Sequence, residues 1–141
     1  MSAPIKILFV VLALVGGFFA QDAWSWLTAS PKPSLAAHCQ LSTVPCEQKG
    51  VSVSISRDVA QPLIPIQVYV EWPKANVDSL RLTLEGHEME MGTARFAIAK
   101  AENGQYQAEV LLPACTMQAM TWVGQLSNGQ QSIDVAIRMA R

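Results

Sequence analysis

The chain has 141 residues, a net charge of −1 at pH 7 and an apolar fraction of 50%. This length suffices for one domain with a modest core once the apolar N-terminus is set aside. The nearly neutral charge, together with the lack of a basic aromatic patch, gives no reason to expect a nucleic-acid partner.

The N-terminal segment from residue 5 to residue 27 is apolar and close to the ~20 residues that a helix needs to cross a bilayer. Trp24 and Trp26 stand where aromatic residues anchor a helix at the membrane interface. Lys6 favours a cytoplasmic N-terminus, so that the rest of the chain faces outward. We therefore predict a membrane anchor over residues 1–28.

A cleaved signal peptide is the alternative for the same segment, because it also begins with a basic end and an apolar run. Cleavage after Ala20 would place Phe18 at the position that needs a small residue, and cleavage after Ala23 would place Gln21 there. Neither site is good, so a retained single-pass anchor is favoured.

Residues 29–50 are predicted to be a linker followed by a cysteine-containing segment. Residues 29–35, ASPKPSL, are rich in Pro and Ser and have no apolar period. Outside the cytoplasm, neighbouring cysteines usually form a disulfide, and the zinc spacing of paired C-x2-C motifs is absent. The odd cysteine count leaves one thiol over. Cys39 with Cys46 is the local pair, and a bridge from either one to Cys115 is the alternative.

Residues 51–141 alternate between apolar and polar side chains with a period of two. The pattern recurs in about seven short segments separated by turn residues, which predicts an all-β domain, an immunoglobulin-like antiparallel β-sandwich. Trp122 is expected in its core, whereas Trp72, at a strand end before a proline, is expected to be half exposed. The segments are VSVSI, IQVYV, LRLTL, ARFAIAK, QYQAEVLL, TWVGQL and SIDVAIRM.

The dipeptide Asn103-Gly104 lies between two of these segments and is the commonest two-residue hairpin turn, since both residues tolerate positive φ. We expect residues 94–100 to pair antiparallel with residues 105–112. The flanking segments 86–93 and 113–120 would then emerge at the same pole of the domain.

This pole would gather several side chains with soft or borderline metal ligands. If the sequence HEMEMG is extended, the imidazole and both thioethers fall on one face and Glu88 and Glu90 on the other, as solubilising charge. Thioether sulfur suits Cu(I), needs no deprotonation and forms no disulfide. The alternative is that the methionines only fill the core. The candidate Cu(I) ligands are His87, Met89 and Met91, with Met117, Met120 and Cys115 as supplementary ligands.

No catalytic machinery can be recognised in the sequence. The two histidines, His38 and His87, do not form a nucleophile, base and orienting group with their sequence neighbours. A glycine-rich phosphate loop and a G-x-S-x-G nucleophile elbow are both absent. We therefore expect that the protein is not an enzyme.

From Glu85 to Met139, the order of features resembles the small β-sandwich domains of the FixH and YtkA-like group. The matching features are EGHEMEMG, a strand, NGQYQAEVLLP with its G-x-Y, the Trp of MTWVGQL and a last strand after NGQ. The N-terminal anchor also suits FixH-type proteins. This resemblance implies a bacterial inner-membrane protein with its C-terminal domain in the periplasm. It also implies a role near SenC-type copper chaperones, in copper handling or haem-copper oxidase assembly, with copper as cofactor and an oxidase or chaperone as partner.

Two other functions remain open. One is a metal-free interaction module whose strand edges or polar loops dock a membrane partner. The other is an accessory subunit that packs against a larger membrane complex through its anchor, where Gly16 and Gly17 would allow close helix approach.

Overall fold

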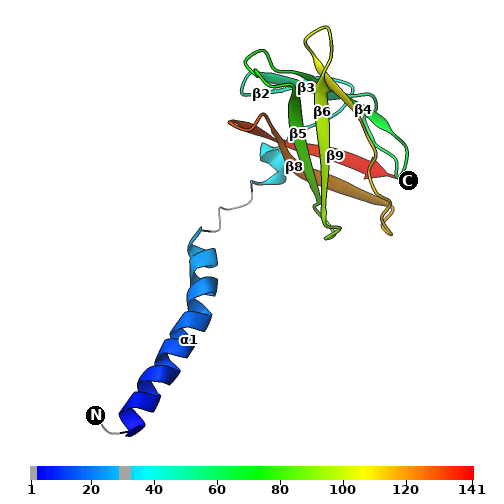
Figure 1. Ribbon diagram of the computed structural model, residues 1–141. Helices are drawn as coiled ribbons and strands as arrows, with labels where there is room; N and C mark the ends of the chain where they lie inside the picture. The colour runs from blue at the N-terminus through cyan, green and yellow to red at the C-terminus, as the bar shows by residue number, and fades with distance from the viewer. Residues whose placement is uncertain (1–2, 29–32) are drawn as a thin grey trace. The chain divides into compact units, whose positions relative to one another are not determined.

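The computed structural model describes residues 3–28 and 33–141, which belong to two separate units, a helix and a β-domain (Figure 1). Helix α1 runs from Ala3 to Thr28, and its apolar side chains are exposed. It is long and apolar enough to cross a membrane. A membrane span and a signal sequence both have this length and composition. The predicted single N-terminal helix is confirmed. The predicted linker falls mostly on residues 29–32, which lie outside the described residues.

The β-domain contains one short 3-10 helix and nine strands in one mixed sheet. The all-β prediction is confirmed. There are more strands than the expected seven or so because the cysteine-containing segment adds β1 and β2 to the sheet. The elements are η1 (Leu35–Ala37), β1 (Cys39–Gln40), β2 (Cys46–Gln48), β3 (Val51–Ile55), β4 (Ile66–Glu71), β5 (Ser79–Gly86), β6 (Thr93–Lys100), β7 (Tyr106–Val110), β8 (Ala119–Ser127) and β9 (Ser132–Ala140).

The strand order is β1-β9-β8-β5-β6-β7-β4-β3-β2. All neighbours are antiparallel except β1 and β9, which are parallel. Strands β6 and β7 pair only at Ala99 with Gln107 and at Lys100 with Tyr106. Because this junction is so short, the sheet can fold over there. The side chains of both parts form a single buried cluster.

The disulfide joins Cys39 in β1 to Cys46 in β2, and Cys115 is a free, buried thiol. The local pairing is therefore confirmed and the bridge to Cys115 is not formed. Since β1 and β2 are the two ends of the strand order, the disulfide links the outer edges of the sheet.

The buried tryptophans are Trp122, which is 0% exposed, and Trp72, which is 5% exposed. The core position of Trp122 is confirmed; its indole Nε1 has no hydrogen-bond acceptor among the described residues, so its contribution is packing. The expectation that Trp72 is half exposed was wrong. Trp72 continues the inward alternation of Ile66, Val68 and Val70 along β4, and this period carries the side chain into the core.

The turn at Asn103-Gly104 differs from the prediction. Only Gly104 has a positive φ, 84°, and its N–H donates to the carbonyl oxygen of Ala101 at 3.0 Å. This geometry is a type I turn with glycine at the fourth position, so the expected positive φ at Asn103 was wrong. The hairpin with positive φ at both turn residues connects β2 to β3 through Lys49 (φ 53°) and Gly50 (φ 77°).

Candidate methionine site

Two methionine-bearing segments lie side by side at one end of β5 and β8: residues 86–92 and residues 115–121. We call them together the methionine pole. Pairing of β5 with β8 aligns Gly86 with Trp122, and the His87 N–H donates to the Thr121 carbonyl oxygen at 2.9 Å. The two segments are therefore neighbours, as expected. They are brought together by the β5–β8 pairing, however, and not by the Asn103-Gly104 hairpin. Strands β6 and β7 pair only next to their turn and cannot align the segments.

The chain reverses direction tightly within the first of these segments. A Cβ atom at Gly86 would collide with the Met89 carbonyl oxygen and would lie 2.9 Å from the Met120 methyl carbon. Residues 87–89 form bends instead of a strand, and Gly92 has a φ of 76°. The expected extended HEMEMG, with its ligands on one face, was therefore wrong. Glycine is needed at position 86 because two chain segments approach each other there without room for a side chain.

The predicted ligands differ in exposure. His87 is exposed, and Met89, Met91 and Met117 are partly buried. Met91 and Met117 pack against the hydrophobic core. Two more of the predicted ligands are buried: Met120 is 0% and Cys115 is 4% exposed. The Cys115 thiol donates to the Met117 carbonyl oxygen at 3.4 Å.

Glu88 fastens the two segments together, a role that sequence reasoning missed. Its carboxylate accepts the Thr121 N–H at 2.6 Å and the Thr121 hydroxyl at 3.1 Å. The Arg138 guanidinium lies 3.7 Å from the same carboxylate and donates to the Thr121 hydroxyl at 3.2 Å. The expectation that Glu88 is only a solubilising charge was wrong. The pattern of the sequence contains no signal for this contact, because Thr121 is 33 residues away.

The electrostatics of this contact favour the ionised carboxylate. Burial raises the pKa of Glu88, but the hydrogen bonds from Thr121 and the charge of His87 together lower it below the usual value of 4.5. The carboxylate is therefore ionised at neutral pH and remains an acceptor for both Thr121 donors. This contact fixes the position of the turn that bears Met89 and Met91.

The methionine pole offers thioether and imidazole ligands rather than a carboxylate or thiolate cage. Across residues 3–28 and 33–141, no three His, Cys, Asp or Glu side chains come close enough to hold a metal ion. A metal site at the pole would therefore depend on thioether sulfur, which suits a soft ion such as Cu(I). Of the four predicted thioether ligands, that of Met120 belongs to a fully buried residue, and the other three belong to residues that are partly exposed.

Comparison with known protein families, with curated proteins and with solved structures finds no match for this chain. The resemblance to the FixH and YtkA-like group therefore stays a prediction from the motifs between Glu85 and Met139.

Proposed function

We propose that this protein is a membrane-anchored accessory protein that binds Cu(I) at the methionine pole and assists copper handling or haem-copper oxidase assembly. The observation that carries the proposal is the fixed contact between the two methionine-bearing segments, with Met89, Met91 and Met117 left partly accessible. In this proposal the protein belongs to a bacterial inner membrane and its β-domain lies in the periplasm.

The chemistry of the ligands supports this assignment. The disulfide between Cys39 and Cys46 indicates an oxidising compartment, in which accessible thiols tend to become oxidised. Thioethers form no disulfide and remain available as soft ligands at any ambient pH. Met89, Met91 and Met117 supply the sulfur ligands, and the exposed imidazole of His87 supplies a nitrogen ligand. Partial burial also shields a bound ion from water while leaving a path for its transfer to a partner.

The exposed apolar surface of α1 supports the anchor. An apolar helix without a protein partner would be unstable in water, whereas a lipid bilayer solvates it. The anchor would hold the copper site close to membrane-bound enzymes that receive copper.

Cu(I) titration of the full chain in detergent, without oxygen and against a competing chelator, tests the proposal. We expect Met89→Leu combined with Met91→Leu to lower the Cu(I) affinity at least about tenfold, equivalent to about 1.4 kcal/mol. The matched control is Met139→Leu, because Met139 is a 1% exposed core residue and the same exchange nearly conserves its volume. Equal Cu(I) affinities for the wild type and the double variant would remove the copper assignment.

A second candidate function, a metal-free docking module, is favoured by a free strand edge. β6 pairs with β5 along its length, but on its other side it pairs with β7 only at Ala99 and Lys100. From residue 93 to residue 98 this edge meets no other strand in the described part of the chain. Unpaired backbone groups on such an edge can accept a strand from a partner protein.

Site-specific photocrosslinking in the membrane distinguishes the second candidate from the first. A photoreactive amino acid in place of Ala97 on β6 should give a defined product with a partner. One in place of the exposed Gln125 on β8, which is paired with β5 on one side and with β9 on the other, should not. Docking through β6 also predicts that the product persists in the double methionine variant. If both positions give the same products, the edge of β6 is not a specific docking site.

A further inference from the structure

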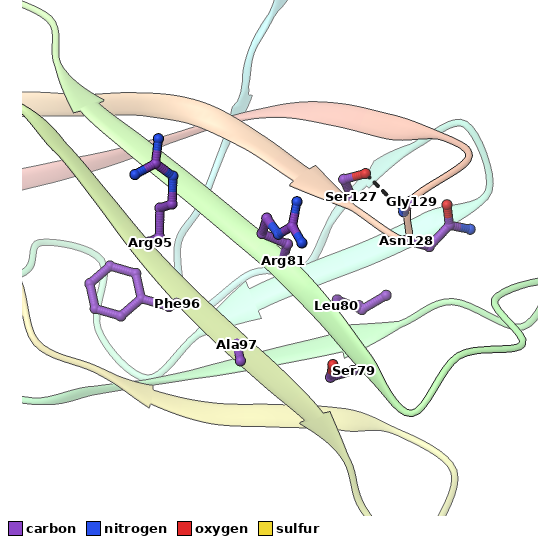
Figure 2. A pocket seen from close by; sticks show the side chains of 9 residues that line it. All are labelled: Ser79, Leu80, Arg81, Arg95, Phe96, Ala97, Ser127, Asn128 and Gly129. Carbon is purple, nitrogen blue, oxygen red and sulfur yellow. Dashed lines mark hydrogen bonds between the residues drawn. The ribbon is translucent and has the colours of Figure 1, made fainter.

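A hollow of about 380 Å³ lies against β5 and β6, beside the turn between β8 and β9 (Figure 2). Its lining consists of residues 79–81 of β5, residues 95–97 of β6 and residues 127–129 at the end of β8. Gly86 and the methionine pole are at the other end of β5, so the hollow is separate from the proposed copper site. None of the lining residues is acidic, and two are arginines.

The sheet register places the two arginines on the same face. Arg81 is opposite Ala97, and Arg95 is opposite Thr83, so the arginines are diagonal neighbours across β5 and β6. Side chains at diagonal positions originate about 7–8 Å apart, which is within reach of long side chains. Figure 2 shows both arginines extending to the same side of the two strands. The small side chain of Ala97 leaves room beside Arg81.

Neither guanidinium has an anionic partner among the residues that the structure describes. The salt bridge found among the described residues joins Arg138 to Glu88, at the methionine pole. Two carboxylates lie on the same face of the sheet, and neither forms a salt bridge with Arg81 or Arg95. Glu85, which is diagonal to Arg95, accepts from the Thr93 hydroxyl at 3.2 Å, and Asp134 accepts from the Gln125 amide at 3.1 Å. Arg81 and Arg95 therefore leave two positive charges side by side, and their mutual repulsion would be relieved by an anion between them.

The turn beside the arginines adds a hydrogen-bond donor. The Ser127 hydroxyl oxygen accepts the Gly129 N–H at 3.0 Å, which leaves its O–H free to donate. The Asn128 side-chain oxygen accepts the N–H groups of Gln130 at 2.9 Å and Gln131 at 2.8 Å. The Asn128 side chain is therefore held over its own turn, and Figure 2 shows it extending away from the arginines. The hollow thus combines two cations with the Ser127 hydroxyl as a neutral donor and has the electrostatics of an oxyanion site.

We propose that this hollow binds the phosphate group of a phospholipid headgroup or of a soluble phosphate ester. One guanidinium fork can satisfy both oxygens of a carboxylate, whereas two forks with the Ser127 hydroxyl match the larger number of oxygens on a phosphate. Phe96 also lines the hollow, but its ring packs against the core on the opposite face of β6 from Arg95 and takes no part in the proposed binding. The site does not depend on copper binding, and either assignment can fail without the other.

Binding of a soluble phosphate ester is tested with the full chain in maltoside micelles, which contain no phosphate. Glycerol 3-phosphate is titrated while the guanidinium Nε–H signals of the arginines are followed by NMR. We expect a saturable shift at Arg81 and Arg95. Arg81→Gln and Arg95→Gln should each weaken binding about tenfold or more, since a hydrogen bond to a charged group is lost. The matched control Arg57→Gln removes the same charge from the loop after β3 and should leave the affinity unchanged.

Binding of a phospholipid headgroup is tested by following the same NMR signals in nanodiscs made of phosphatidylcholine with or without phosphatidylglycerol. If the natural ligand is an anionic headgroup, phosphatidylglycerol shifts the signals of Arg81 and Arg95, and the double glutamine variant loses the response of its neighbouring backbone signals. Binding of glycerol 3-phosphate without a lipid response would identify a soluble ester. The proposal is overturned if neither probe produces a response, or if the response in either arm survives in the double variant.

Discussion

The disulfide between Cys39 and Cys46 provides a quantitative test of how the β-domain is held together. β1 contains only Cys39 and Gln40 and is attached to β9, while β2 extends from Cys46 to Gln48 and is attached to β3. These short strands are the two ends of the sheet. Reduction of the disulfide should therefore release both ends and lower the free energy of unfolding.

The magnitude follows from the length of the closed loop. The two cysteines are separated by 7 positions. For a loop of about eight residues, the lost chain entropy is about 8 cal/mol/K, which is about 2.5 kcal/mol at 25 °C. For the domain from Pro33 to Arg141, this corresponds to a decrease of about 10 °C in Tm, given about 2.1 cal/mol/K of unfolding entropy per residue.

Guanidinium-induced unfolding of the full chain in detergent, followed by near-ultraviolet circular dichroism, measures this difference with and without a reductant. The matched control is Cys39→Ala with Cys46→Ala, whose stability should not respond to the reductant and should be close to that of the reduced wild type. Cys115 is already a free thiol and is unaffected. An effect of the reductant below about 0.5 kcal/mol on the wild type, or an equal effect on the control, would refute the reasoning, because the entropic model requires several times more.

Three other substitutions test the packing and the methionine pole. A Cβ at Gly124 would collide with the backbone of β5, so Gly124→Ala should cost about 3 kcal/mol or more in thermal or chemical unfolding. The buried Tyr106 hydroxyl donates to the Val77 carbonyl oxygen at 2.6 Å, and Tyr106→Phe should cost about 1–2 kcal/mol in the same assay. Because Thr121 and other partners lower the pKa of Glu88 in the folded state, its stabilising contribution is present above pH 4.5 and is lost as the pH falls through the folded value. The stability difference between wild type and Glu88→Gln should therefore shrink in acid; a difference that stays constant would contradict this.

Several features were predictable because they depend on neighbouring residues. The apolar run of α1 and the period-two strands follow from local side-chain patterns, and the short separation of Cys39 and Cys46 favours their pairing. The position of Trp72 was predictable in principle, since it continues the alternation of β4, but the following proline suggested a strand end instead. Local patterns specify which residues form an element and which of its faces is buried.

What only the tertiary structure decided is the set of partners across strands. Gly86 meets Trp122, Glu88 accepts from Thr121, and Arg81 stands diagonal to Arg95, although no local pattern in the chain links these residues. The physical reason is that strand order and register depend on burying all inward faces at once, and a shift of one residue would turn every core side chain outward. The sequence by itself therefore determined the apolar N-terminal helix and the strands, while packing of the whole sheet decided which side chains meet at the methionine pole and in the hollow lined by Arg81 and Arg95.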